Sequence, residues 1–480
     1  MSYKFITMKT INVIFLAVLM IFSVNVASAQ KSESPNIVVM LVDNLGWGEL
    51  GCYGGGNLRG AETPQLDQLA SEGIRFQNFN VEPQCTPSRS ALMTGRHPIR
   101  SGTTKVVWGI LYGMTQWEVT LPELLSDNGY TTGMFGKWHL GDTKGRFPTD
   151  QGFDEWYGIA NTTDESVYTS HYQYDSELLK QPYIVEATKG QTPKQVKAYN
   201  IETRRTIDSE LTEKAIHFMK KSVDSKDPFL AFVPFTQPHL PTLPHPDFEG
   251  KTGNGHYADV LAEIDYRSGQ ILTAIDDLGI RENTIVLWLS DNGPEEIEGH
   301  HGTSGYWRGN YFTALEGSLR VPAIMRWPGK IAAGKVTNEI IHMTDILPTM
   351  ASIVGAETPK DRIIDGIDQS DFLLGKQEHS NRDGFPIFNG DEMFAYKWKN
   401  WKMHLIELNS MFAAPARLNM PHVFNLIEDP KEKYPIDQVD ISGSWVFPVM
   451  FEKIVDFQKT LAVEPPIQLG TPDPYVPVKN

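Results

Sequence analysis

The sequence predicts an α/β fold with a large, mostly parallel β-sheet that helices cover on both faces. Buried strands and amphipathic helices alternate along most of the 480 residues, which is the pattern of parallel βα units. The strands are continuous apolar runs rich in β-branched residues, which is typical of strands buried on both faces. The chain is too long for one simple core. Near residue 380 the pattern changes to short apolar runs separated by turns, so we expect a smaller second subdomain.

The first predicted element is a buried strand at residues 36–42, with the sequence NIVVMLV. A helix follows from Thr63-Pro64 to Glu72, and Gly73 closes it. The remaining elements show one of two patterns. Continuous apolar runs predict buried strands, and apolar residues three and four positions apart predict helices. The expected strands are 131–135, 229–235, 284–289 and 321–327, and the expected helices are 207–221, 257–278 and 344–354.

Beyond residue 380 the expected strands are short and antiparallel. They cover residues 385–388, 393–397 and 401–405, and Asn389-Gly390 is a hairpin signal between the first two. A helix at about 445–462 and a proline-rich tail at 464–480 complete the chain. The sequence therefore predicts an antiparallel α+β subdomain at the C-terminal end.

The N-terminal segment has the features of a secretory signal peptide. Lys4 and Lys9 precede an apolar run at 11–22, and Val26-Ala27-Ser28-Ala29 offers a cleavage site after Ala29. The alternative is a signal anchor, but the run is short for a membrane span. We expect an exported protein, periplasmic or secreted.

Charge and cysteine content narrow the functional classes. The formal net charge is −16, and loss of the two lysines with the signal segment would make it −18. Such an acidic chain excludes nucleic acid and anionic membranes as expected partners. The two cysteines, Cys52 and Cys85, form a disulfide or, if Cys85 has another role, leave Cys52 as a small buried apolar residue.

The most informative motif is Cys85-Thr86-Pro87-Ser88-Arg89. Pro87 is suited to the first turn of a helix, and Arg89 falls four residues after Cys85, on the same helical face. A nucleophile at a helix N-terminus with an arginine one turn later is suited to binding an oxyanion. The alternative is a buried cysteine beside the start of a helix.

Two acid–amide pairs predict a metal site. Asp43-Asn44 follows the first buried strand, and Asp291-Asn292 follows the strand at 284–289. Four oxygen ligands at two strand ends suit Ca²⁺ or Mg²⁺. The alternative for each pair alone is a tight turn.

Basic residues follow two further strands. Gly136-Lys137-Trp138-His139 lies after the strand at 131–135, and His239 lies after the strand at 229–235. A histidine at such a position can act as a general acid. Taken alone, Lys137 and His139 are better explained by a polar loop, and His239 by a hydrogen-bonded loop histidine.

Together these motifs resemble type I sulfatases, in the arylsulfatase-like branch of the alkaline phosphatase superfamily. The resemblance runs from Pro35 to beyond Tyr434 and includes the segment from Glu316 to Pro322 and the run from Asn425 to Pro430, both interpreted as structural. It implies an alkaline phosphatase-like fold, with a signal peptide at 1–29, a catalytic domain at 30–380 and a C-terminal subdomain and tail at 381–480.

The resemblance also implies a mechanism for sulfate ester hydrolysis. A maturation enzyme oxidises Cys85 to formylglycine, whose hydrated aldehyde attacks sulfur. Arg89 and a metal ion, Ca²⁺ or Mg²⁺, hold the nucleophile and the sulfate. Lys137 and His239 bind the leaving side, and His139 helps to remove a proton before sulfate is expelled. The substrate is a small sulfate ester, either an aryl sulfate or a sulfated sugar.

Two positions depart from the family pattern. The family has a second aspartate where this chain has Asn44, and a lysine where it has Tyr311. The first change removes a negative charge from the metal site, and the second removes a positive charge near the sulfate. We expect the changes to be coupled, with Tyr311 or Arg308 replacing the lysine as a donor.

Three functions remain open from the sequence: a sulfatase, a phosphomonoesterase or phosphodiesterase on the same scaffold, and a non-catalytic exported binding protein. We expect loops to form the rim of the pocket, at Trp108, Tyr112, 161–168 and 300–306.

Overall fold

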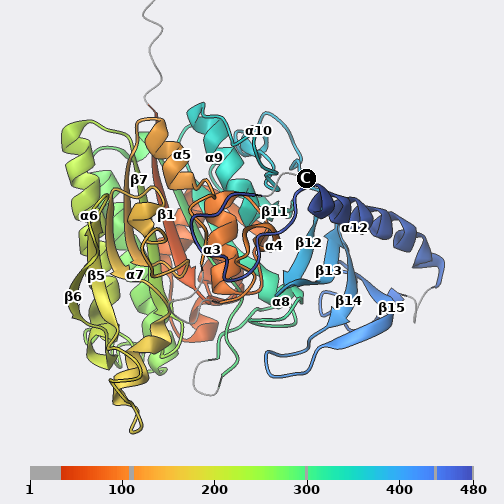
Figure 1. Ribbon diagram of the computed structural model, residues 1–480, viewed down its shortest axis with the longest axis horizontal. Coiled ribbons are helices and arrows are strands. Elements are labelled where there is room, and N and C mark those ends of the chain that lie inside the picture. The colour runs from red at the N-terminus through yellow and green to blue at the C-terminus, as the bar shows by residue number, and fades with distance from the viewer. Residues whose placement is uncertain (1–33, 107–112, 298–300, 437–440, 478–480) are drawn as a thin grey trace, which may run out of the picture.

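A computed structural model describes residues 34–106, 113–297, 301–436 and 441–477. Its largest element is a sheet that contains eleven strands among the described residues (Figure 1). The order is β10-β2-β9-β8-β1-β7-β3-β4-β5-β6, and β11 also pairs with β2. The strands are β1 Asn36–Asp43, β2 Ile74–Asn80, β3 Thr131–Lys137, β4 Glu155–Ile159, β5 Tyr183–Thr188, β6 Lys194–Ala198, β7 Phe229–Pro238, β8 Thr284–Ser290, β9 Arg320–Arg326, β10 Lys335–Thr337 and β11 Ile341–His342.

The centre of this sheet is parallel, because β1 pairs in parallel with both β7 and β8 and β3 pairs in parallel with β7 and β4. Antiparallel pairs occur toward the sides, where β9 joins β8 to β2 and where β5 joins β4 to β6. The predicted large, mostly parallel sheet is therefore confirmed.

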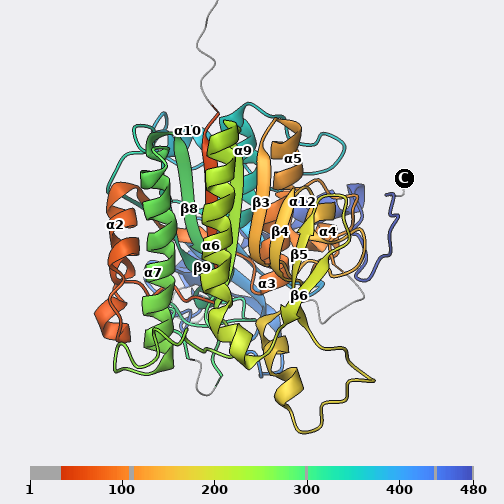
Figure 2. The same ribbon diagram turned by 90° about the vertical axis from the view of Figure 1, so that its left-hand side faces the viewer.

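Helices cover both faces of the sheet, which explains why its central strands are continuous apolar runs. In β1, Val39 and Leu41 join the core on one face, and Val38 and Met40 join the core on the other. α2, α6 and α7 lie on one face (Figure 2), and α3, α5 and α9 pack on the opposite face. The helices of this part are α2 Pro64–Glu72, α3 Cys85–Thr94, α4 Pro98–Ser101, α5 Leu121–Asp127, α6 Ile201–Ser225, α7 His256–Asp277, α8 Glu316–Leu319, α9 Ile346–Val354 and α10 Ser370–Leu373.

A second, four-stranded antiparallel sheet confirms the expected C-terminal subdomain. It consists of β12 Gly384–Asn389, β13 Glu392–Trp398, β14 Trp401–Glu407 and β15 Ala416–Asn425, and α12 Val446–Val463 packs on it (Figure 1). The described part of the tail has no regular structure. It lies against the large domain, where the N–H of Ile467 donates to the carbonyl of Arg100 and Arg146 pairs with Asp473.

Several expectations were incomplete. α6 begins six residues before the expected start, because the Asn200 side chain caps it by accepting from the N–H groups of Glu202 and Thr203. The first turn of the helix expected at 344–354 is a 3₁₀ turn, Met343–Asp345. The sequence analysis missed β2, β4, β5, β6, β10, β11 and β15 and the helices α4, α5, α8 and α10.

Two further expectations concern cysteine and membranes. Cys52 and Cys85 form no disulfide, and Cys52 packs against the core as a partly buried residue. Among the described residues, none of the helices has the length and apolar character needed to cross a bilayer. The expected signal peptide lies outside the described residues.

Candidate functional site

The carboxyl ends of three parallel strands place the central side chains of the site. Asp43 ends β1, His239 follows β7 and Asp291 follows β8. Because β1 lies between β7 and β8, these three residues converge at one edge of the sheet. Cys85, the first residue of α3, lies against the same edge, and its Sγ, an Asp43 oxygen and a His239 ring nitrogen all lie within 4.8 Å of one another.

Cys85 is fully buried, and three oxygen atoms surround its sulfur. The Sγ atom lies 3.4 Å from Asn44 Oδ1, 3.4 Å from the Tyr311 hydroxyl and 3.7 Å from Asp43 Oδ1. Burial raises the pKa of the Cys85 thiol well above its ordinary value. An unconverted cysteine at this position is therefore a protonated thiol, which is a poor nucleophile.

Two cations neutralise the two aspartates. Lys137, at the end of β3, donates to Asp43 Oδ2 at 2.7 Å. Arg89 donates from Nε and Nη2 to Asp291 Oδ2 at 3.0 and 2.8 Å, and its Nη2 also lies 3.4 Å from Asp43 Oδ1. All four side chains are buried, so each charge is paired inside the protein.

The charges of this cluster shift the pKa of each member. Burial would raise the pKa of Asp43, but the positive charges of Lys137, His239 and Arg89 hold it well below its ordinary value. For Asp291, burial and the neighbouring Asp43 charge prevail and raise the pKa to about 6. Lys137 keeps a raised pKa despite its burial because Asp43 stabilises its charged form.

The donor set fits a hard divalent cation. Asp43, Asn44, Asp291 and Asn292 together bring carboxylate and amide oxygens to one buried place, the ligands that Ca²⁺ and Mg²⁺ prefer. The Asn292 amide nitrogen donates to Asn44 Oδ1 at 2.6 Å, and the buried Asn292 Oδ1 has no hydrogen-bond partner among the described residues. Buried polar atoms are rarely left unpaired, so a cation facing Asn292 Oδ1 explains this oxygen. Asn44 adopts a left-handed conformation (φ 63°), which asparagine tolerates.

Short polar contacts hold His239 in place. Its Nδ1 lies 2.6 Å from the Thr163 hydroxyl and 2.8 Å from the carbonyl of Leu240, and its Nε2 lies 3.7 Å from Glu295 Oε1. Glu295 is buried and accepts the Leu240 N–H at 3.0 Å. The sequence analysis placed Thr163 in an expected rim loop but did not predict its contact with His239. It did not identify Glu295, although this residue lies only three positions after Asn292.

A cavity of about 210 Å³ opens beside these residues. Its walls combine polar groups with apolar side chains, and His139 and Tyr311 contribute to them. His139 is buried and left-handed (φ 62°), and its carbonyl accepts the Thr86 hydroxyl at 2.9 Å. The lining residues are Val106, His139, Thr162, Asp164, His239, Leu240, Glu295, Ile297, Tyr311, Phe312 and Met411.

The two candidates for the expected donor, Tyr311 and Arg308, lie differently relative to the site. The Tyr311 hydroxyl touches the Cys85 sulfur, whereas Arg308 is absent from the cavity wall. The rim expectation was correct for Thr162 and Asp164 but not for His301 to Tyr306, whose Thr303 instead accepts the N–H of Gly48. Trp108, Tyr112 and His300 lie outside the described residues.

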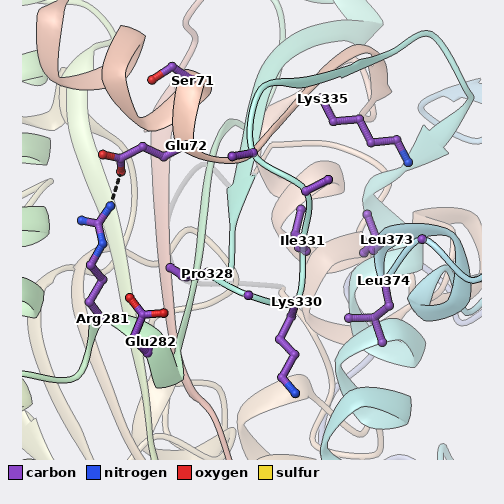
Figure 3. A pocket seen from close by; sticks show the side chains of 14 residues that line it. Ser71, Glu72, Arg281, Glu282, Pro328, Lys330, Ile331, Lys335, Leu373 and Leu374 are labelled. Carbon is purple, nitrogen blue, oxygen red and sulfur yellow. Dashed lines mark ion pairs between the residues drawn. The ribbon is translucent and has the colours of Figure 1, made fainter.

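A larger hollow of about 700 Å³ lies at the opposite edge of the sheet (Figure 3). Arg281 and Glu282 in its wall precede β8, and Pro328 follows the antiparallel β9. These positions place it at the amino ends of the central strands, away from Cys85. In Figure 3, Arg281 pairs with Glu72, at 2.8 Å.

Comparisons with known proteins agree on one family. A sequence profile described as Sulfatase matches residues 35–356. N-acetylgalactosamine-6-sulfatase of Canis lupus familiaris is 31% identical over 479 residues, which cover 92% of this chain and 89% of that protein. Human arylsulfatase A is 33% identical over 443 residues, 85% of this chain and 84% of that protein.

Solved structures show the same similarity. The crystal structure of the PsFucS1 sulfatase from Pseudoalteromonas sp. has a TM-score of 0.85 and 32% identity, and the match covers 93% of this chain and 94% of that one. A structure described under the metabolism of multiple glycosaminoglycans by Bacteroides thetaiotaomicron has a TM-score of 0.72 and 26% identity, and covers 90% of this chain and 99% of that one.

Proposed function

Because the chain belongs to the sulfatase family and hydrolyses sulfate esters, we propose that its nucleophile is a formylglycine made from Cys85. The observation that carries this proposal is the environment of the Cys85 sulfur, which faces Asp43, Asn44 and Tyr311 at the first residue of α3. The raised pKa of the thiol argues against direct attack by sulfur. The hydrated aldehyde would supply the attacking oxygen and, on collapse, release sulfate.

We assign the metal site to Asp43, Asn44, Asp291 and Asn292, with Ca²⁺ as the ion. Two observations support Ca²⁺: the unpaired Asn292 oxygen and a ligand set that combines carboxylates with amides. Ca²⁺ tolerates irregular shells of oxygen ligands better than Mg²⁺ does. Bound there, the ion would add positive charge beside the sulfate oxygens.

The surrounding side chains have separate roles. Arg89 fixes Asp291 through two hydrogen bonds to one carboxylate oxygen, and Lys137 fixes Asp43. The Tyr311 hydroxyl is a donor for an oxygen bound at residue 85. His239, held through Nδ1, keeps Nε2 on the cavity side to protonate the leaving oxygen, and His139 in the cavity wall accepts the proton of the second hydroxyl. Fixed charges in a buried site supply most of the rate enhancement.

We propose a sulfated sugar as the substrate, bound by a single ring. The cavity of about 210 Å³ is smaller than the roughly 300–1,000 Å³ of pockets that enclose drug-sized ligands. Thr162, Asp164 and Glu295 can bind hydroxyl groups, and Phe312 and Met411 offer apolar surface for ring C–H groups. The names of two similar proteins, an N-acetylgalactosamine-6-sulfatase and a structure from glycosaminoglycan metabolism, support a sugar.

One substrate panel tests this function. It compares kcat/KM for 6-sulfated N-acetylgalactosamine, an aryl sulfate, a phosphate monoester and a phosphodiester. We expect both sulfates to be hydrolysed and the sugar sulfate to be preferred. Preference for the aryl sulfate contradicts the assignment of the sugar, and preference for either phosphate ester contradicts the assignment of the site.

We further propose that the protein is exported after removal of residues 1–29 and that a separate maturation enzyme converts Cys85. The basic, apolar and small-residue regions of this segment support export. N-terminal sequencing of the mature protein, together with mass spectrometry of the peptide containing residue 85, tests both steps. A retained N-terminus contradicts cleavage, and an intact thiol contradicts conversion.

A further inference from the structure

A second buried cluster, behind the nucleophile helix, has the side chains of a metal site. It consists of Glu82, His97 and His342, and one donor atom from each lies within 4.8 Å of the other two. All three side chains are buried. Glu82 follows β2, His97 precedes α4 and His342 ends β11, so the cluster joins three elements that are separate in sequence.

The contacts within the cluster leave one nitrogen without a partner. His97 Nδ1 lies 2.9 Å from Glu82 Oε1, which is a normal hydrogen bond. His342 Nε2 lies 3.8 Å from the same oxygen, too far for a hydrogen bond, and this buried nitrogen has no other partner in the part of the chain that the structure describes. Hydrogen bonding therefore accounts for Glu82 and His97 but not for His342.

The second ring nitrogen of His342 has two contacts with Thr344. Nδ1 lies 3.0 Å from the Thr344 hydroxyl and accepts the Thr344 N–H at 3.3 Å. Zinc binding at Nε2 requires the ring proton on Nδ1, where the Thr344 hydroxyl can accept it, so binding exchanges the N–H contact for this hydrogen bond. Metal-bound histidines are oriented by such outer contacts.

The local charges permit a cation. Three cations near the cluster already have carboxylate partners: Arg382 pairs with Asp345, Lys397 with Glu316 and Arg100 with Asp365. Glu82 contributes a negative charge. In a tetrahedral zinc site the ligand atoms are about 3.3 Å apart. The distances of 2.9 and 3.8 Å from Glu82 Oε1 lie on either side of this value, and the two histidine nitrogens lie within 4.8 Å of each other.

We propose that Glu82, His97 and His342 bind Zn²⁺, with one water molecule as the fourth ligand. Two imidazoles and one carboxylate are an established zinc donor set. Binding displaces the proton shared by Glu82 and His97. Glu82 lies three residues before Cys85, and its backbone N–H and carbonyl both bond to the Ser88 hydroxyl in α3, at 3.1 and 3.0 Å. The ion would hold Glu82 in place and so stabilise the position of the start of α3, the helix that carries the nucleophile.

The test uses the full chain carrying Cys85→Ala, because the thiol at the active site could itself bind zinc. The protein is stripped of metal, saturated with Ca²⁺ and dialysed against Zn²⁺, and bound zinc is measured by mass spectrometry of the metal. We expect one equivalent per chain and a thermal midpoint that rises with zinc concentration. No zinc above the buffer level overturns the proposal.

Two variants in the same background locate the ion. His342→Gln should weaken zinc binding at least tenfold. His404→Gln is the matched control, because His404 is also buried and bonded to a glutamate, Glu432, at 2.8 Å, but belongs to no three-ligand group among the described residues. Equal zinc binding by His342→Gln overturns the proposal. If that variant fails to fold, anomalous diffraction from zinc-loaded Cys85→Ala crystals decides: a peak among the three side chains supports the site, and its absence contradicts it.

Discussion

Asn44 and Tyr311 are the two residues at which we expect this chain to depart from the usual sulfatase motifs, and both contact the nucleophile position. Asn44 Oδ1 and the Tyr311 hydroxyl each lie 3.4 Å from the Cys85 sulfur. If the usual residues are an aspartate and a lysine, a neutral amide replaces a carboxylate and a neutral hydroxyl replaces an ammonium group. The total charge around residue 85 would then be the same in both arrangements.

We predict that these two replacements are energetically coupled. Asn44→Asp alone adds a negative charge beside a bound anion, and Tyr311→Lys alone adds an unbalanced positive charge, so each should lower kcat/KM. The double variant restores the usual pair, and the expected coupling is about 0.5–3 kcal/mol. The measurement is a double-mutant cycle on an aryl sulfate. Strictly additive losses would show that the two residues act separately.

The metal ligands provide a second prediction. Asn292→Ala removes the unpaired amide oxygen and should weaken Ca²⁺ binding at least tenfold, whereas Asn44→Asp should tighten it, because a second acidic group raises the affinity for Ca²⁺. Calorimetry on metal-free Cys85→Ala protein measures binding without catalysis. Unchanged affinity in both variants would exclude these residues from the shell.

The sequence was most informative for residues that belong to contiguous motifs. Asp43, Cys85, Lys137 and Asp291 were identified from local patterns, and the structure brings them together. Arg308, the alternative donor to Tyr311, is not among the residues that line the cavity. Thr163 and Glu295 contact His239 only through the tertiary fold, which local patterns do not reveal.

At the scale of elements, close packing of strands positions the site. Gly136 precedes Lys137 in β3 and has φ 148°, and a Cβ there would lie 1.8 Å from the carbonyl oxygen of Pro234 in β7. No side chain fits at this position without separating β3 from β7, and Lys137 would move with the strand.

Gly136→Ala should therefore destabilise the protein severely and abolish activity. Gly190→Ala is the matched control: Gly190 also has a positive φ, of 80°, but a Cβ there meets nothing within 4 Å. Gly190→Ala should lower the free energy of unfolding only through backbone strain, by about 1 kcal/mol. Urea unfolding and kcat/KM for both variants give the comparison. Equal effects of the two substitutions would refute the packing argument.

A buried acid in α7 provides a prediction about pH. Burial raises the pKa of Glu263 to about 7, although Glu263 accepts the His245 N–H at 2.8 Å. Between pH 4.5 and 7 the unfolded chain ionises at this position while the folded chain stays protonated, so its contribution to stability is lost as pH rises through about 7.

Glu263→Gln keeps an acceptor for His245 but cannot ionise. Relative to the wild type, its free energy of unfolding should improve by about 2 kcal/mol between pH 5 and pH 8. Denaturant titrations of both proteins at the two pH values measure this difference. A difference that does not change with pH would mean that Glu263 has an ordinary pKa.

Burial decided which elements the sequence could reveal. β1 and β8 are covered on both faces and were found as apolar runs, whereas β6, KQVKA, is largely exposed at a sheet edge and has no such run. α6 extends beyond its apolar stripe because of the Asn200 cap. Pairings such as β9 with β2 join segments that are distant in sequence, and the local pattern of apolar residues does not predict them.

At the scale of the whole molecule, buried charges join the two sheets. Glu316 in α8 pairs with Lys397 in β13 and Lys402 in β14, at 2.7 and 3.1 Å, and Lys402 also pairs with Glu432. Removing one partner of such a network leaves an uncompensated buried charge. The segment that contains Glu316 therefore connects the large sheet to the C-terminal subdomain through buried ion pairs.

The central claim is that sulfate ester hydrolysis depends on an aldehyde at residue 85. Its most direct test measures kcat/KM for an aryl sulfate on preparations in which mass spectrometry has determined the fraction of Cys85 converted. We predict that activity rises in proportion to that fraction and that Cys85→Ala retains less than about a hundredth of it. Full activity in protein whose Cys85 is an intact thiol, or in Cys85→Ala, would contradict the account.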